Sequence, residues 1–499
     1  MKLATRLFAH ALAFAALVVT AAQPAAAQSI LRDAETEALL KDMVDPLVEA
    51  AGMPAGSVDV VLVQDPSINA FVAGGQRIYV HSGLINAADT ANEVQGVLAH
   101  ELGHITGGHV ISGGEAYSKA NKIALLTTLL GIAAAVAGAG DAAMAGMALG
   151  QQAALSSFLS FSRTQEASAD AAAVHYLKCS GTSGRGVVSF FRKLQNLEFR
   201  HGYSQSDEAG FMRTHPLTGD RISHLEADLR SDPAWGNAPD ADLPDADLIA
   251  RIDAPLSPDD ATPPPVEFAS CTTPPVSAQP QAQAGELEQR FQLAKAKLYG
   301  YLAEPKDTLR AYPTRITAAP ARYARAYAYH KDARIDQALA ECDALVVSDP
   351  RNPYFLELKG QILLESGKPV EALVPLRQAV QLTGNEPLIA GTFGHALLAT
   401  EDKANLDEAE NVLRAAVGRD RENPFAWYQL GMVYGERGDI PRARLASAEQ
   451  QIMTGRAREA LQNAEAAERS LPSGSTDWIR AGDVALQARA ELEREQERH

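Results

Sequence analysis

Small residues and prolines recur at a fixed spacing in the C-terminal part of the chain, and this repetition restricts its fold more than any other feature of the sequence. Alanine, glycine and proline each return in one register, at separations of 34 and 37 residues. The positions are Ala338, Ala372, Ala409 and Ala443; Gly360, Gly394 and Gly431; and Pro353, Pro387 and Pro424. A period of this length indicates a stack of similar units that bury their apolar faces against one another.

The period predicts paired helices over residues 286–499. Small residues let two helices approach closely, and the prolines start or stop each pair. The three extra residues of the longer interval fall in the loop around residues 401–406, and the spacing decays beyond Ala443, so we expect irregular or capping helices over residues 456–486. The pattern resembles tetratricopeptide repeats, which implies an α-solenoid whose concave surface takes extended peptides or partner proteins. The alternative is a helical bundle with accidental spacing.

Residues 231–285 differ in composition from the segments on either side. They contain the run Thr-Pro-Pro-Pro at 262–265 and several Asp-, Ala- and Pro-rich stretches. Such sequences cannot bury much apolar surface, so we predict an extended connector there and a separate folded domain over residues 28–230. Two folded units and a linker also fit the length of 499 residues, which is too long for a single hydrophobic core.

The first domain contains a short histidine motif on a predicted helix at residues 91–105. Positions four apart lie on one helical face, so His100 and His104 can bind a single metal ion while Glu101 projects beside them. A zinc ion bound in this way activates water, and Glu101 is positioned to act as the general base. The motif therefore predicts peptide-bond hydrolysis with one zinc ion per chain. The alternative is a chance pair of helical histidines.

A catalytic zinc ion needs a third protein ligand. Metzincins use a histidine ten residues after the first, and this chain has Val110 there. Glu166 is the better candidate because Asp170 follows four residues later on the same predicted helical face. We expect Glu166 to bind the metal and Asp170 to accept a hydrogen bond from a ligating imidazole. A solvated acidic helix end is the alternative.

Further motifs surround these residues in a characteristic order. They are Asn69-Ala-Phe71, Gly74-Gly75, Ile78-Tyr-Val80 and Ser82-Gly-Leu84 before the histidine motif, and Thr214-His-Pro216 with Arg221-Ile222 after Glu166. In this order and spacing the chain resembles the gluzincin-type zinc metallopeptidases that include HtpX and the CAAX prenyl proteases. It is most similar to the periplasmic BepA-type members with a tetratricopeptide tail. The resemblance covers nearly the whole chain after residue 27.

The resemblance implies zinc held by His100, His104 and Glu166, with Glu101 as general base. It also implies that His215 and Arg221 lie near the metal. His215 would then cap the metal in a latent state or bond to substrate, and Arg221 would stabilise the oxyanion. Without the resemblance, these two residues are an ordinary helix start.

The implied fold is mainly α. An α+β zincin-like metallopeptidase domain with a small edge-strand sheet precedes the solenoid. Residues 70–80 alternate around two glycines, which predicts a hairpin or edge strand that lines the cleft. An unpaired edge can hold an extended substrate by main-chain hydrogen bonds, with loose sequence preference.

The first 27 residues have the composition of a secretory signal. Lys2 and Arg6 precede an apolar run that ends in three alanines at 25–27. We therefore expect cleavage near Ala27 and a periplasmic protein; a retained membrane anchor is the alternative. Two of the cysteines can pair after export, although the sequence does not select which two. A formal net charge of −17 without a basic stripe argues against a nucleic-acid partner.

Residues 123–150 are almost free of charge and interrupted by Asp141. We interpret them as a helical hairpin that packs over the active site or contacts the membrane surface. A membrane span and simple core packing are the alternatives.

These features predict a periplasmic zinc endopeptidase that degrades misfolded or stalled envelope proteins. The repeats are then expected to recruit protein substrates or the outer-membrane assembly machinery. A chaperone or binding scaffold with a structural or latent zinc site is the alternative function. The presence of Glu101 speaks against the scaffold, because a structural zinc site needs no general base.

Overall fold

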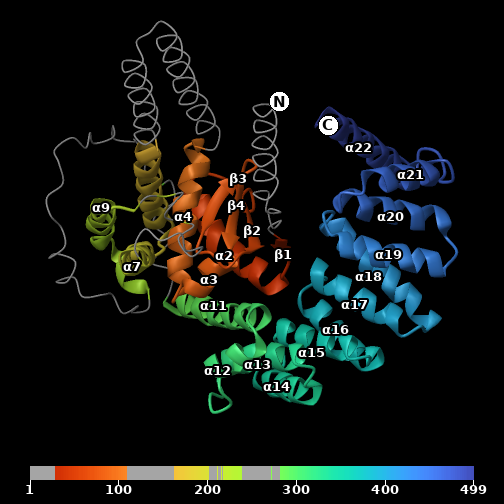
Figure 1. Ribbon diagram of the computed structural model, residues 1–499, viewed down its shortest axis with the longest axis horizontal. Helices are drawn as coiled ribbons and strands as arrows, with labels where there is room; N and C mark the ends of the chain where they lie inside the picture. Colours follow the sequence, from red (N-terminus) through yellow and green to blue (C-terminus); the bar gives the residue numbers. More distant parts are fainter. Residues whose placement is uncertain are drawn as a thin grey trace, which may run out of the picture.

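The computed structural model describes residues 29–109, 162–201, 211, 215, 217–238, 271 and 281–498. The signal-like N-terminus, the 123–150 segment and most of the 231–285 connector lie outside the described residues. The described part is predominantly helical, as predicted, with one small sheet (Figure 1). In this part of the chain, no helix is both long and apolar enough to cross a membrane.

The sheet has four strands in the order β1-β2-β4-β3. The strands are β1 (Ser29–Leu31), β2 (Asp59–Gln64), β3 (Ala70–Ala73) and β4 (Arg77–His81). β2 and β4 are parallel, and the two outer pairs are antiparallel. The predicted hairpin is confirmed as β3 and β4, and Gly74 and Gly75 in its loop have φ angles of 64° and 98°, which favour glycine. β1 and β3 are the two edges.

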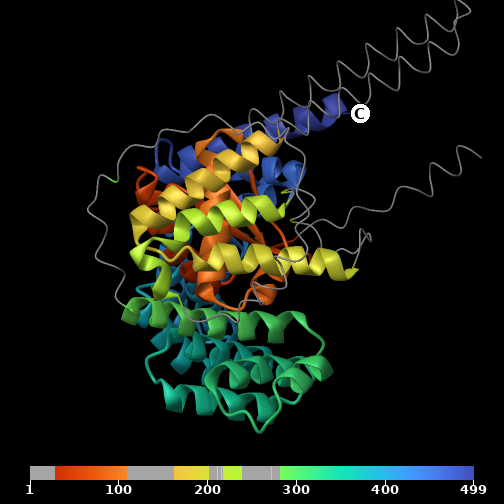
Figure 2. The same cartoon turned by 90° about the vertical axis from the view of Figure 1, so that its left-hand side faces the viewer.

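Helices surround this sheet and form one core with it. They are α2 (Ala34–Ala50), α3 (Ser82–Ala87), α4 (Ala91–Thr106), the 162–180 helix, α7 (Arg185–His201) and α9 (Gly219–Arg230), followed by the short η2 (Pro233–Asn237). The 162–180 helix, α7 and α9 lie together over α4 and the strands (Figure 2). Every residue of α4 from Ala91 to His104 is buried, so the predicted motif helix is the centre of the domain.

The repeats form antiparallel helix pairs. The pairs are α13 (Ala319–Lys331) with α14 (Ile335–Ser348), α15 (Pro353–Glu365) with α16 (Pro369–Leu382), α17 (Pro387–Ala399) with α18 (Leu406–Arg419), α19 (Pro424–Glu436) with α20 (Ile440–Met453), and α21 (Ala457–Glu468) with α22 (Thr476–Arg498). A short helix, η3 (Lys403–Asn405), occupies the predicted three-residue insertion.

The repeated prolines and two of the three repeated glycines have the predicted structural roles, whereas a Cβ atom at Gly431 would make only an ordinary contact, 3.4 Å from Ala446. Pro353, Pro387 and Pro424 each begin the first helix of a pair. A Cβ atom at Gly360 would lie 2.4 Å from Leu376 of the paired helix, and one at Gly394 would lie 2.5 Å from Leu413. The missing side chains therefore allow the close packing that the period indicated.

Helix α11 (Gln281–Leu302) joins the two units, and α12 (Pro305–Ala311) follows it. Phe291 and Leu298 of α11 are buried in the core of the first domain. The boundary expected at residue 286 therefore lies within a helix that packs against both units. In addition, residues 233–237 of the expected connector form η2, and the hydroxyl of Ser183 donates to the carbonyl of Trp235.

A buried polar network fixes the repeats to the first domain. The ammonium group of Lys297 in α11 lies 2.5 Å from Asp33 and 3.4 Å from Glu35, at the start of α2. Tyr323 of α13 donates to Glu35 over 2.8 Å. Further along the solenoid, Arg32 forms an ion pair with Asp420 at 2.9 Å. The solenoid thus curves alongside the sheet (Figure 1).

The structure pairs Cys179 with Cys271 in a disulfide and leaves Cys342 free and buried in α14. Cys179 lies at the C-terminal end of the 162–180 helix. The disulfide therefore links that helix to the segment between the two folded units.

Candidate metal centre

Two helices that are distant in sequence approach each other at a glycine. A Cβ atom added to Gly103 of α4 would lie 2.7 Å from the carbonyl oxygen of Ala169 and 2.8 Å from its Cα. No side chain fits between the two backbones, so only glycine permits this contact at Gly103. Because Gly103 lies between the histidines of α4, and Ala169 lies between Glu166 and Asp170, the contact brings the predicted ligands together.

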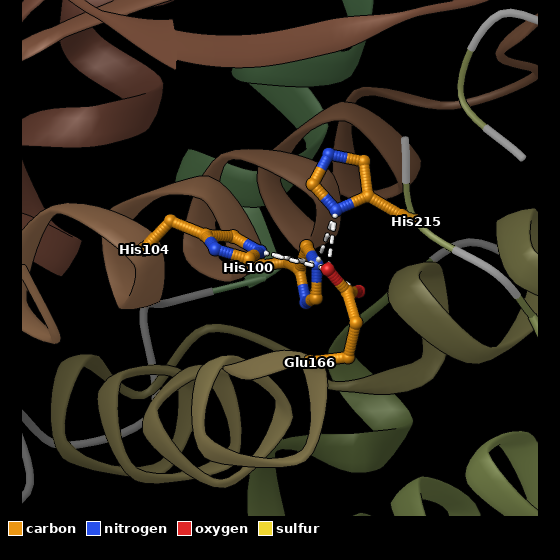
Figure 3. Close-up of side chains that lie close together, drawn as sticks. All are labelled: His100, His104, Glu166 and His215. Atoms are coloured by element: carbon orange, nitrogen blue, oxygen red, sulfur yellow. Dashed lines mark hydrogen bonds and ion pairs between the residues drawn. The ribbon is translucent and has the colours of Figure 1, made fainter. Parts of the chain in front are cut away.

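Four side chains converge at this contact (Figure 3). The Nε2 atoms of His100 and His104 are 3.2 Å apart. The carboxylate of Glu166 lies 3.3 Å from His100 Nε2 and 3.4 Å from His104 Nε2. His215 completes the group, with its Nδ1 3.0 Å from Glu166 and 3.4 Å from His100 Nε2. All four residues are buried.

These distances fit a tetrahedral zinc site. Zinc bonds of about 2.0–2.1 Å to nitrogen and oxygen place neighbouring ligands about 3.3 Å apart. The five distances between ligand atoms range from 3.0 to 3.4 Å. Three imidazoles and one carboxylate are also a donor set that zinc prefers. The described residues therefore fit the ion that the sequence predicted, with His215 in the fourth position.

Asp170 and Arg221 lie behind the ligands. Asp170 is 3.0 Å from the Nδ1 atom of His100, on the side of the ring away from the other ligands. A proton held on Nδ1 leaves Nε2 available to a metal. The guanidinium of Arg221 donates to both oxygens of Asp170, over 2.7 and 2.8 Å, and forms an ion pair with Glu166 at 3.0 Å.

Glu101 is fully buried beside the four ligands. Neither of its carboxylate oxygens accepts a hydrogen bond, and the Nε2 atom of His215 is 3.4 Å from one of them. Burial raises the pKa of Glu101, although the positive charges of His215 and His100 act in the opposite direction. A carboxylate with a raised pKa can take up a proton and release it again near neutral pH.

The charges around the ligands also shift the pKa values of the histidines. Burial alone would lower the pKa of His100, but Asp170 and Glu166 raise it to about 10. For His104, burial and the charge of His100 lower the pKa to about 2. Asp170 and Glu166 therefore favour the protonated form of His100, and a metal ion would compete with that proton.

His109 also lies beside this cluster, although it belongs to none of the sequence motifs. Its Nδ1 atom lies 2.9 Å from the Nδ1 atom of His104. The ring of His109 therefore contacts the side of His104 that faces away from the ligand cluster, as Asp170 does for His100. The sequence shows only that His109 follows His104 by five residues. This spacing does not by itself place two rings in contact.

An α+β domain with a buried His-Glu-His cluster, joined to helical repeats, defines a metallopeptidase-like protein with a repeat domain. Residues 34–229 match the sequence profile of Peptidase family M48. Over this segment, which is less than half of the chain, the sequence is similar to the peptidases of that family.

Relatives extend the similarity beyond this domain. The beta-barrel assembly-enhancing protease of Escherichia coli K12 is 24% identical over 428 residues, which span 84% of this chain and 76% of that protein. A protein of Vibrio cholerae serotype O1 with a related name is 31% identical over 232 residues, and this match spans 45% of the chain and 46% of that protein. Among solved structures, YrrB, described as a TPR protein with an unusual peptide-binding site, is 22% identical with a TM-score of 0.29, covering 35% of this chain and 91% of YrrB.

Proposed function

We propose that this chain is a zinc-dependent endopeptidase of the periplasm that hydrolyses misfolded or stalled envelope proteins. The convergence of His100, His104 and Glu166 beside the buried Glu101 carries this proposal. A zinc ion held by these ligands activates water for attack on a peptide carbonyl. Side chains of the protein carry out the proton transfers and orient the ligands.

Glu101 is the general base in this proposal. Its raised pKa and its position beside the ligand cluster suit a carboxylate that takes a proton from water and then donates it to the leaving amine. Asp170 orients His100 through Nδ1. In the same way, we propose that His109 orients His104.

His215 and Arg221 have regulatory and positioning roles in this proposal. His215 lies in the fourth ligand position and near Glu101, so it excludes a substrate carbonyl until it moves. Arg221 contacts Asp170 and Glu166 and thereby holds two carboxylates in place. These contacts favour a positioning role for Arg221; the oxyanion role inferred from the resemblance stays a prediction.

Metal analysis and casein cleavage together test the peptidase. We expect about one zinc ion per chain, loss of zinc in His100→Ala, and cleavage that is abolished by chelator and by Glu101→Gln. His215→Ala is included because it removes the proposed latch, and it should raise basal cleavage. A folded protein that takes up no zinc, or cleavage unaffected by Glu101→Gln, contradicts the proposal.

The location and partners are part of the same proposal. The signal-like residues 1–27 support export, and the descriptive name of the Escherichia coli relative supports a role in the assembly of outer-membrane β-barrels. Osmotic-shock release of the protein, followed by N-terminal sequencing, tests export. Co-purification with outer-membrane assembly components tests recruitment, and retention of all the protein in the cytoplasm would contradict both.

A further inference from the structure

A cavity of about 580 Å³ lies between the first domain and the repeats, away from the metal centre. Its walls come from β1 and the start of α2 on one side. On the other side they come from α11 and from the first helix of four successive pairs, α13, α15, α17 and α19. Ligand-binding pockets commonly measure about 300–1,000 Å³. The volume is therefore sufficient for several side chains of a bound molecule.

One wall of the cavity is an edge of the sheet. Within the described residues, β1 pairs with β2 alone, so the other side of β1 presents main-chain groups to the cavity. Ile30 of this strand is 57% exposed. An exposed edge of this kind can add a further strand through main-chain hydrogen bonds.

The opposite wall presents large apolar side chains. Tyr301 of α11 is 49% exposed, and Phe425 of α19 is 44% exposed. Tyr428 and Met432 follow Phe425 at three and seven positions along α19, and both are exposed. Residues at this spacing share one helical face, so the apolar surface continues beyond the cavity along α19. An elongated surface of this kind suits a chain segment better than a compact molecule.

Two residues that line the cavity also carry buried polar atoms without partners. Among the described lining residues, the Oε2 atom of Glu357 and the Nδ2 atom of Asn423 are buried and form no hydrogen bond. Lys297 and Arg32 also line the cavity, but Asp33 and Asp420 already pair with them. Buried polar groups are usually satisfied. A ligand that offers a cationic donor to Glu357 and a carbonyl oxygen to Asn423 would satisfy both.

We propose that this cavity binds an extended polypeptide segment that carries a basic side chain. Its main chain pairs with β1, its apolar side chains pack on Tyr301 and Phe425, and a lysine or arginine contacts Glu357. This inference rests on the proposed function, because the bound segment is substrate on its way to the metal centre. β1 and β3 are three strand spacings apart in the sheet, or about 14 Å. One unfolded chain can therefore reach from the cavity to the β3 edge.

Fluorescence anisotropy with the full chain in the uncleaving Glu101→Gln background tests the site. The probe is a fluorescein-labelled nine-residue peptide of alternating Val and Thr, with a Phe and a central Lys; the matched probe has norleucine in place of Lys. We expect Glu357→Gln to weaken binding of the Lys probe about tenfold, which corresponds to loss of a hydrogen bond to a charged group, and to change the norleucine probe little. Glu371→Gln, on the exposed surface of α16, is the control and should bind both probes as before.

A second pair of variants makes the test independent of Glu357. Phe425→Ala should weaken both probes, whereas Val374→Ala should not, since Val374 is 61% exposed on α16 and does not line the cavity. A photoreactive p-benzoylphenylalanine at Thr392, which lines the cavity, should cross-link to the probe, and the same group at Val374 should not. Absence of probe binding, or binding unaffected by both Glu357→Gln and Phe425→Ala, overturns the inference.

Failure of the proposed peptide-binding site can be distinguished from failure of the proposed peptidase activity. With Glu101 intact, Glu371→Gln should leave the cleavage of a short fluorogenic peptide and of unfolded casein unchanged. Glu357→Gln should keep the zinc content of the wild type and slow the cleavage of unfolded casein, which is long enough to occupy both sites. A zinc-free wild-type protein that still binds the Lys probe would overturn the peptidase and leave the binding site standing.

Discussion

The contacts of Asp170 lead to a quantitative prediction for Asp170→Asn. The carboxylate of Asp170 lies 3.0 Å from His100 Nδ1 and accepts two hydrogen bonds from Arg221. Asparagine has a single acceptor oxygen, and its amide nitrogen can only donate. It therefore cannot satisfy both His100 and the two donors of Arg221. At least one buried N–H group loses its partner, and the Arg221 guanidinium then contacts only one carboxylate, that of Glu166, instead of two.

The loss of these contacts should lower both the metal affinity and the stability of Asp170→Asn. Replacing a partner that orients a metal ligand costs about 10–100-fold in metal affinity. Removing one member of a buried ion pair costs about 3–5 kcal/mol of stability. Because Arg221 also contacts Glu166, part of its charge stays compensated, and we expect a stability loss at the lower end of this range. The double variant Asp170→Asn with Arg221→Met removes the uncompensated charge, so its loss of stability should be smaller than the sum of the two single losses.

Competition with a chromophoric zinc chelator measures the affinity, and urea unfolding of the metal-free protein measures the stability. Asp228→Asn is the matched control, since Asp228 is an exposed aspartate on α9. It should bind zinc as the wild type does. Zinc affinity within twofold of wild type in Asp170→Asn, or losses that add fully in the double variant, would refute the assigned role of Asp170.

Three further predictions follow from other contacts. His109→Ala should lower zinc affinity about tenfold through His104, whereas His224→Ala on the exposed face of α9 should not; equal affinities in the chelator assay would count against His109. Lys297→Ala leaves the buried Glu35 and the partly exposed Asp33 without their cation and should lower the free energy of unfolding by about 3 kcal/mol, the lower end of the range for a buried pair; a loss below about 1 kcal/mol in urea would disprove this. Burial raises the pKa of Glu357 to about 8, against the opposing charge of Lys297. The neutral form is therefore favoured in the folded protein, and its stabilisation is lost as pH rises from about 4.5 through 8. Glu357→Gln should consequently gain in melting temperature relative to wild type over that interval, and a constant difference would contradict the shifted pKa.

Several elements could be predicted from local sequence patterns. The motif helix was expected over residues 91–105 and is observed as Ala91–Thr106. The glycine hairpin at β3 and β4, the paired repeat helices and their starting prolines also follow the pattern. Each of these depends on the periodicity of a helix or strand, or on a backbone angle that glycine or proline allows. Neighbouring residues determine such features.

Contacts between distant segments could not be predicted in this way. The pairing of Cys179 with Cys271, the insertion of α11 into the first core and the ion pair of Arg32 with Asp420 each join parts of the chain with no shared pattern. The contact of His109 with His104 could not be predicted for a related reason. His109 lies just past the C-terminal end of α4, where helical spacing no longer indicates which way a side chain points.

The sequence alone therefore determined which residues have the chemistry to hold a metal and which segments repeat, because residue type and helical period are local properties. Tertiary structure alone decided that Gly103 lies against Ala169, that His215 lies beside the three other potential ligands, and that the repeats close a cavity against β1. These arrangements arise from the packing of whole helices against one another. The free energy of this packing depends on contacts among many residues at once, so it cannot be predicted from a short stretch of sequence.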